Sequence, residues 1–420
     1  EWISGFTGSA GFAIITNDHA YLFVDGRYTS QAHQQASGFE IIDWPKHDIT
    51  DILKGERLGF DPALISASQA EKLAEKLGEN FIPTPNLIDA IWSDRPSPAP
   101  YRLRLLPEEL AGETSKSKRK AIAAKLAESA LDGFVSNNPE SLAWLLNIRG
   151  GAIPMVPAPQ GYFIIHKTGK MDVFLDATPE FALDAEFHPQ RALDQALADF
   201  QGQLGYNPLL LPYGRLLKIK NPKPIKDPVI QAKARKNPAE IKASHHAHDL
   251  DGRAMIRLLT WLDQQDPTTL DELKCASRLL EFRKEAPEFK ISSFDTISAW
   301  GANAANAHYH ATQNAFAHFD ANGLYLVDSG GHYRGATTDV TRTIAIGNGI
   351  ESAKVPFTQV LNGLAQISTC QFPKGMAGRD IDALARASLW RAGRNFNHGT
   401  GHGVGAELSV HEGPASISPR

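Results

Sequence analysis

The stretch LYLVDSGGHYRGATTDVTRTIAI, residues 324–346, predicts two β-strands joined by a glycine-rich polar turn. The first strand is apolar and ends on Asp328, whereas the second alternates, so that Asp339 shares a face with Thr341 and Thr343. If the strands pair antiparallel, Asp328 and Asp339 lie at matching ends of the hairpin, where opposed side chains are about 5 Å apart at Cβ. Two carboxylates that close repel each other unless a proton or cation lies between them. The hairpin alone therefore indicates either a two-metal site or two solvated turn aspartates.

A second glycine-rich segment, HGTGHGVG at residues 398–405, carries His398 and His402, and His411 follows in SVHEGP. Glycine lets the backbone approach a bound ion or substrate closely, because no Cβ intervenes. Histidine is a common neutral nitrogen ligand for metals. The histidine pair would be a weak signal alone, but together with the aspartate hairpin it favours a metal site.

Several segments, taken together and in their order along the chain, resemble the pita-bread metallopeptidases, in particular their Xaa-Pro aminopeptidase (aminopeptidase P) branch. They are AHYH at 307–310, VDSGGHYRGATTDVTRT at 327–343, DIDALARASLW at 380–390, NHGTGHGVG at 397–405 and VHEGP at 410–414. Upstream, FTGSAG and DGRY in the first 28 residues and LAWLLNIRG at 142–150 resemble the earlier domains of the three-domain subgroup. The resemblance covers nearly the whole chain.

This resemblance implies an α/β (α+β) fold with two creatinase-N-like α/β domains followed by a pita-bread catalytic domain. Proline-rich residues 96–107 mark the first boundary. We expect domains at 1–97, 98–230 and 231–420. SLAWLLNIRGG and its following hairpin echo WISGFTGSAG and its own hairpin, which indicates an internal duplication. Because the chain starts without Met inside a structured segment and stops just after a motif, we expect a fragment that lacks both ends of the protein.

By the same resemblance, Asp328 would bind one metal ion, Asp339 would bridge two ions, and His402 would bind the other. The expected cofactor is therefore a pair of divalent metal ions. Ligation dominated by oxygen with one histidine favours Mn²⁺, with Co²⁺ or Zn²⁺ as substitutes. Such ions lower the pKa of a bridging water, so that hydroxide attacks the scissile carbonyl.

Three further histidines match family positions around the substrate, namely His308, His398 and His411. The roles implied for them are hydrogen bonding to the carbonyl or the tetrahedral intermediate, and proton handling. The family completes its metal site with two glutamates, which would lie beyond Arg420. We therefore expect the fragment alone to be inactive.

The composition excludes several classes of function. The 420 residues carry a net charge of −4, which gives no indication of a nucleic-acid or membrane-surface partner. No apolar run approaches the roughly 20 residues that span a bilayer. The chain has 2 cysteines, which argues against a disulfide scaffold and predicts a cytoplasmic location. A signal peptide before Glu1 stays compatible with the sequence.

The first functional hypothesis is an aminopeptidase that removes the N-terminal residue from peptides with proline at the second position. The expected partners are such peptides, and the resemblance implies a homodimer. The alternative within the fold is a prolidase that cleaves Xaa-Pro dipeptides; two α/β domains before the catalytic domain favour the aminopeptidase. A non-catalytic peptide-binding protein is the third reading, and the retained Asp328, Asp339 and His402 argue against it.

Local patterns predict further elements. Asn237 and Glu240 should form a capping box at the start of a long helix, and Thr268 should cap the helix after it. Residues 307–310 should form a strand. The proline- and lysine-rich segment 207–228 should be an exposed connection.

Overall fold

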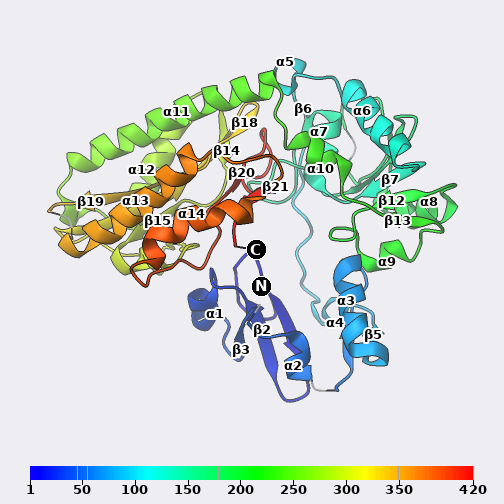
Figure 1. The fold of residues 1–420 in the computed structure, drawn as a ribbon, viewed down its shortest axis with the longest axis horizontal. Coiled ribbons are helices and arrows are strands. Elements are labelled where there is room, and N and C mark those ends of the chain that lie inside the picture. The colour runs from blue at the N-terminus through cyan, green and yellow to red at the C-terminus, as the bar shows by residue number, and fades with distance from the viewer. Residues whose placement is uncertain (45, 54, 178, 349, 420) are drawn as a thin grey trace.

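The computed structural model describes residues 1–44, 46–53, 55–177, 179–348 and 350–419. Figure 1 shows three regions of the chain. The first, in blue, lies at the bottom of the view, and the second, in cyan and green, lies on the right. The third runs from helix α11 (Pro238–Asp263) to the last described residue and lies on the left.

The first region contains two small sheets rather than one. Its elements are β1 (Phe12–Ile15), β2 (Ala20–Val24), α1 (Thr29–Gln35), β3 (Glu40–Asp43), α2 (Ile49–Leu53), β4 (Leu58–Phe60), α3 (Ala67–Leu77), η1 (Gly78–Asn80), β5 (Phe81–Pro83) and α4 (Leu87–Ile91). Strands β1 and β2 form an antiparallel hairpin and β3 joins β2 in parallel, whereas β4 and β5 form a separate parallel pair. The start of α3 lies against the second region, where the Ala67 amide donates to the Leu211 carbonyl at 2.9 Å.

The second region is built on a six-stranded sheet with the order β11-β10-β9-β7-β12-β13. Its elements are β6 (Arg104–Leu105), α5 (Glu108–Ala111), α6 (Ser115–Glu128), β7 (Gly133–Ser136), α7 (Pro139–Leu146), β8 (Ile148–Arg149), β9 (Tyr162–His166), β10 (Met171–Phe174), β11 (Glu186–His188), η2 (Gln190–Ala192), α8 (Leu193–Asp199), β12 (Leu204–Tyr206), α9 (Tyr213–Leu216), β13 (Pro222–Pro224) and α10 (Pro228–Lys233). Apolar side chains cover both sheet faces, so the sheet is the core of this region.

The prediction that residues 207–228 form an exposed connection is wrong. This segment contributes α9 and the edge strand β13, and Leu211 and Ile219 are buried in the apolar core. Proline suits an edge strand, because an edge strand needs fewer backbone donors than a central one. The segment therefore completes the sheet.

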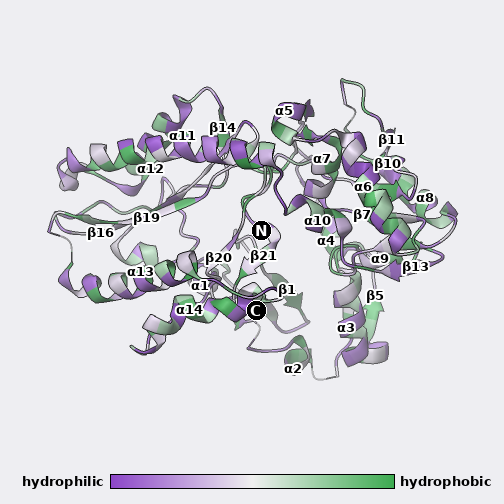
Figure 2. Ribbon diagram, turned by 45° about the horizontal axis from the view of Figure 1, so that its top comes forward, coloured by the Kyte–Doolittle hydropathy of each residue, from purple (hydrophilic) through white to green (hydrophobic). Residues whose placement is uncertain are grey.

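The third region stacks helices on both sides of a strand layer. Its elements are α11, η3 (Pro267–Thr269), α12 (Glu272–Lys284), β14 (Phe289–Ser292), β15 (Ile297–Trp300), η4 (Gly301–Ala305), β16 (Gly323–Ser329), β17 (Gly331–Tyr333), β18 (Ala336–Thr337), β19 (Val340–Ile346), η5 (Glu351–Ala353), α13 (Lys354–Thr369), α14 (Gly378–Trp390), β20 (Gly401–Gly403) and β21 (Glu412–Ile417). Figure 2 shows β16 and β19 between the α11–α12 pair and the α13–α14 pair, with hydrophilic and hydrophobic residues mixed along each helix. Within the described residues, no helix is long and apolar enough to cross a membrane.

The capping box predicted for α11 is confirmed. The Asn237 side chain accepts hydrogen bonds from the Ala239 and Glu240 amides, and the Glu240 carboxylate accepts one from the Asn237 amide. The predicted Thr268 cap of α12 is wrong. Asp271 caps that helix. Thr268 lies inside the preceding short helix η3, whose N-cap is Asp266.

The hairpin at residues 324–346 is present, but its register and turn differ from the prediction. Asp328 lies opposite Thr341 rather than Asp339, which precedes β19 on the same face. The predicted turn is itself a buried hairpin of β17 and β18, which pairs with β14 in a second sheet. Gly330 allows the chain to cross between the sheets, since a Cβ there would lie 2.0 Å from the Thr338 carbonyl oxygen.

A buried ion pair joins the helices to these strands. The Arg283 guanidinium on α12 donates to both carboxylate oxygens of Asp251 on α11, at 2.6 and 3.1 Å, and to the Ser329 hydroxyl at 3.0 Å. The Tyr333 hydroxyl donates to the same Asp251 at 2.8 Å. Because Ser329 follows Asp328, this pair helps to hold the end of β16 in place.

Asp251→Ala should lower the free energy of unfolding by about 3–5 kcal/mol, because it leaves the Arg283 charge buried without its partner. The change is measured by urea unfolding followed through the fluorescence of Trp261 and Trp300, which belong to the same apolar cluster. Glu285→Ala is the matched control, since it removes an exposed partner of Arg257 on the same helix pair and should leave the midpoint near that of the parent. Equal destabilisation by both changes would contradict the role given to the buried pair.

Candidate active site

The two aspartates of the hairpin lie at the edge of the third region's strand layer. Asp328 is the second-last residue of β16, and its buried carboxylate oxygen Oδ1 has no hydrogen-bond partner among the described residues. The pKa of Asp328 is raised to about 6, chiefly by burial and also by the nearby charge of Asp339, while a hydrogen bond from Thr341 acts in the opposite direction. A buried carboxylate oxygen that lacks a partner is costly, so this atom is suited to receive a cation.

His402 completes a cluster with these aspartates. It lies on β20, and its Nε2 is 3.1 Å from Asp339 Oδ2. The hydrogen bond with Asp339 raises the pKa of His402, and the charge of Asp328 adds to that effect. On the other side of the ring, Nδ1 donates to the Gly403 carbonyl at 2.8 Å, which fixes the ring orientation and directs Nε2 toward the aspartates.

These side chains fit a divalent metal ion. Two carboxylates and one imidazole provide oxygen and nitrogen ligands, and the unpartnered Asp328 oxygen lies in the same cluster. The second ring nitrogen of His402 is held by a backbone carbonyl, as is usual for histidine ligands. The structure therefore brings together the residues for which the sequence predicts a metal role.

The other predicted histidines surround this cluster. The ring of His411 packs edge-on against that of His402, with centroids 4.4 Å apart. The pKa of His308 is lowered to about 4, chiefly by burial and also by the charges of Arg27, His411 and His398. His398 is exposed and its Nδ1 donates to the Gly399 carbonyl at 2.7 Å, so it is the least enclosed member of the set.

His308 is positioned by the first region of the chain. Residues 307–310 do not form the predicted strand; they form a turn and an extended segment after η4. His308 Nδ1 lies 2.6 Å from the Tyr28 hydroxyl, and the two rings are 4.9 Å apart. Tyr28 in turn bonds to the Ser9 hydroxyl at 2.6 Å.

Sequence reasoning missed this contact, although both partners belong to quoted motifs. Tyr28 closes the DGRY motif and His308 lies in AHYH, 280 residues later. A family resemblance places each motif in a domain but does not say that the two touch. The close approach of Gly26 to Asn397, the residue before His398, was also not predicted; a Cβ at Gly26 would lie 2.9 Å from the Asn397 side chain.

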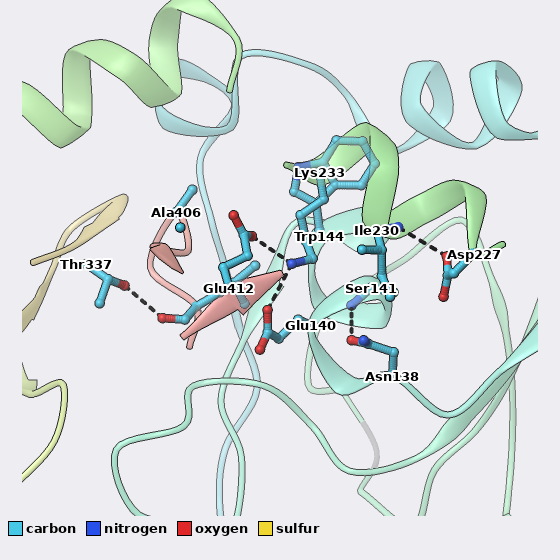
Figure 3. Close-up of polar contacts among 12 residues, drawn as sticks. Asn138, Glu140, Ser141, Trp144, Asp227, Ile230, Lys233, Thr337, Ala406 and Glu412 are labelled. Carbon is cyan, nitrogen blue, oxygen red and sulfur yellow. Dashed lines mark hydrogen bonds and ion pairs between the residues drawn. The ribbon is translucent and has the colours of Figure 1, made fainter. Parts of the chain in front are cut away.

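A buried ionic cluster from the second region lies behind His411. Glu412, the residue after it, accepts from Lys233 at 2.6 Å and also pairs with Lys236. Lys233 donates at the same time to Glu140 on α7 at 2.9 Å. Figure 3 shows Lys233 between the two carboxylates, so α7 and α10 together fix the start of β21.

The loop between His402 and His411 is also tied to the aspartate hairpin. Glu407 pairs with Arg104 and accepts from the Gly335 amide at 2.8 Å. The Thr337 hydroxyl donates to the Leu408 carbonyl at 2.8 Å. Buried Arg149 donates to the Ala406 carbonyl at 2.5 Å. The loop after His402 is therefore bonded both to the hairpin that precedes Asp339 and to the second region.

Comparison with known proteins identifies the family. Residues 242–420 match the metallopeptidase family M24, and residues 94–240 and 1–91 each match a creatinase/prolidase N-terminal domain. A probable Xaa-Pro aminopeptidase P from Aspergillus fumigatus is 36% identical over 457 aligned residues, which cover 100% of this chain and 70% of the relative. The chain belongs to the aminopeptidase P branch of metallopeptidase family M24. The resemblance read from its motifs is confirmed, as is the α/β fold with two creatinase-like units and a pita-bread domain.

Solved structures with a similar fold include an aminopeptidase and a dipeptidase. The X-prolyl aminopeptidase of Caenorhabditis elegans, described as a cytosolic enzyme with a di-nuclear active site, superposes with a TM-score of 0.93 at 31% identity. That match covers 99% of this chain and 73% of the nematode chain. The Xaa-Pro dipeptidase of Bacillus anthracis has a TM-score of 0.58 at 23% identity and covers 73% of this chain and 86% of its own, so it supports the fold alone.

Tyr28→Phe should lower kcat/KM of the full-length enzyme by up to about tenfold, because it removes the hydrogen bond that orients His308, worth about 1 kcal/mol. The ring stays packed among Phe6, Leu22 and Val24, so the fold should be retained. Steady-state kinetics and the thermal midpoint are measured side by side.

Tyr21→Phe is the control, since Tyr21 lies on β2 of the same region and packs against a different apolar cluster from Tyr28. It should leave kcat/KM unchanged. An equal loss of activity in both variants, or no loss in Tyr28→Phe, would contradict the positioning role of Tyr28.

Proposed function

We propose that the protein removes the N-terminal residue from peptides that carry proline at the second position. The observation that supports this most is the cluster of Asp328, Asp339 and His402 inside an architecture that matches the nematode X-prolyl aminopeptidase over 99% of the chain. Prolidases resemble a version with one creatinase-like domain before the catalytic domain. This chain instead matches two creatinase-like units, at residues 1–91 and 94–240. The aminopeptidase is therefore favoured over the prolidase.

The cofactor we propose is a pair of divalent metal ions, with Mn²⁺ as the native metal. Asp328 and His402 would each hold one ion, and Asp339 would contact both. This chain covers 70% of the Aspergillus fumigatus relative, so activity is to be measured on the full-length protein. When bound, such ions polarise the scissile carbonyl and activate water.

The histidines would supply hydrogen bonds and proton transfer around that centre. With its pKa near 4, His308 is neutral at physiological pH. If Ser9 donates to Tyr28 and Tyr28 donates to His308 Nδ1, then Nε2 carries the remaining proton and can donate it to the substrate carbonyl. Burial together with His402 lowers the pKa of His411, so it is also suited to act as a neutral donor or acceptor. His398, the exposed histidine, would contact the substrate from the solvent side.

Two further proposals concern the setting of the enzyme. We place it in the cytoplasm, which is supported by the 2 cysteines being free and by the cytosolic description of the nematode enzyme. We also propose a homodimer, on the resemblance to the three-domain subgroup alone. A size measurement in solution tests the second proposal directly.

Asp339→Asn should reduce the manganese bound after reconstitution and lower kcat by about 100-fold or more, since a catalytic metal contributes several kcal/mol. Metal content is measured by mass spectrometry on chelator-stripped protein reloaded with Mn²⁺. Asp320→Asn, a change at an exposed aspartate, is the control and should bind and cleave as the parent does. Full manganese content in Asp339→Asn would contradict its assignment as a ligand.

The manganese-loaded full-length enzyme should release the first residue from an Xaa-Pro-Pro peptide and leave Xaa-Ala-Pro intact. Product analysis by liquid chromatography compares these peptides with an Xaa-Pro dipeptide. Cleavage of the dipeptide alone would assign the protein as a prolidase. The absence of turnover with Mn²⁺, Co²⁺ and Zn²⁺ would favour the non-catalytic peptide-binding reading.

A further inference from the structure

A second group of metal-ligating side chains lies outside the candidate active site, on the sheet of the second region. His166 on β9, Asp172 on β10, and Glu186 and His188 on β11 belong to three adjacent strands. Asp172 is paired with Ile164 on one side and with Glu186 on the other. Because side chains alternate along a strand, all four residues point to the same sheet face.

The ligand atoms of this group converge on Asp172. His166 Nε2 lies 2.6 Å from one carboxylate oxygen of Asp172, and His188 Nε2 lies 3.4 Å from the other. Ligand atoms from Asp172, Glu186 and His188 all lie within 4.8 Å of one another, and among the described residues no other such group of three is found. Asp172, Glu186 and His188 therefore border one small space at the sheet edge, and His166 adjoins it through Asp172.

Neighbouring aromatic rings hold both imidazoles in this orientation. Phe200 packs against His166 with centroids 5.5 Å apart, and Phe174 stacks on His188 at 5.2 Å. The Asp172 side chain is only 16% exposed, whereas His188 is 37% and Glu186 58% exposed. Asp172 is thus largely buried at the base of the site, whereas His188 and Glu186 are open to solvent, so an ion can enter from the solvent side.

Lys170 provides the positive charge at this site in the structure. Its Nζ lies 3.0 Å from Glu186 and 3.6 Å from Asp172. The lysine side chain is half exposed and flexible, so it can swing into solvent when a cation takes its place. The carboxylates then neutralise a divalent ion instead of an ammonium group.

We propose that this group is a structural site for a divalent transition-metal ion, with zinc as the occupant, held by Asp172, Glu186 and His188 and completed by His166. Mixed imidazole and carboxylate ligands at four positions suit Zn²⁺, which takes tetrahedral coordination with ligands at about 2.0–2.2 Å. Two ligand atoms of one tetrahedral zinc ion lie about 3.4 Å apart, which is the observed separation of His188 Nε2 and Asp172 Oδ1 at 3.4 Å. His166 Nε2, which lies 2.6 Å from the other Asp172 oxygen, would have to move back slightly by a side-chain rotation.

The site would fasten the edge of the sheet. Strand β11 has three residues, lies at the sheet edge, and follows a connection whose described residues between β10 and β11 form neither helix nor strand. Such a strand has few backbone bonds to hold it. An ion that bridges His188 and Glu186 to Asp172 and His166 would tie β11 to β10 and β9.

The test uses manganese-loaded full-length protein, exposed to excess Zn²⁺ and then freed of unbound metal. The parent should retain one more zinc per chain than His188→Asn, because the variant loses a ligand and even supporting residues change metal affinity by about 10–100-fold. Zinc should also raise the thermal midpoint of the parent more than that of the variant. Zinc displacing manganese at the active site affects both proteins alike, so the difference reports the second site.

His19→Asn is the matched control, since His19 is an exposed histidine that pairs with the single carboxylate of Glu40 at 2.7 Å. It should bind zinc as the parent does. Equal zinc content in the parent and in folded His188→Asn would overturn the proposal. If His188→Asn does not fold, the Lys170→Met variant is tested instead. Removing the competing lysine charge should tighten zinc binding about tenfold. An unchanged zinc affinity in Lys170→Met would overturn the proposal.

Discussion

Asp328 and Asp339 occupy one face at the end of β16 and β19, next to His402, and this juxtaposition of charges is the constraint that the third region is built around. Burial and the charge of Asp339 both oppose ionisation of Asp328, whose Oδ1 has no hydrogen-bond partner in the part of the chain that the structure describes. Such an arrangement is unfavourable unless a cation contacts it. The surrounding structure is needed to keep these groups from separating.

That support comes from regions far apart in the sequence. The Asp251–Arg283 pair fixes the end of β16, while Lys233 and Glu140 hold Glu412 beside His411. Each of these is a buried ionic group, which adds little net stability but is strongly destabilising when one partner is lost. We interpret them as positioning contacts. Tyr28 adds a further one from the first region, so all three regions reach the site.

Sequence reasoning succeeded where the determinants are local or strictly periodic. The capping box of α11 depends on four consecutive residues, Asn237 to Glu240. The apolar strand that carries Asp328 and the alternating strand after Asp339 predict a hairpin. It failed where several local choices compete, as in the DPTTLDE segment, where Asp266 and Asp271 act as caps and Thr268 does not. The register of the hairpin also could not be derived, because an inserted buried pair, β17 and β18, shifts Asp328 to Thr341.

The sequence also could not predict contacts between segments that lie far apart along the chain. Neither the Tyr28–His308 bond nor the convergence of His166, Asp172 and His188 has a spacing signal, since the partners meet only through tertiary packing and strand order. The motif resemblance grouped the candidate site residues by family role. The structure adds which of them touch, and which neighbours hold them.

The most direct measurement of the central claim is an anomalous-difference map from crystals of the full-length protein grown with manganese. The account predicts strong peaks in contact with Asp328, Asp339 and His402, bordered by His308 and His411. A map with no peak at these three residues, in crystals where manganese is bound elsewhere, would contradict it. The function would then have to be sought in peptide binding without metal-assisted cleavage.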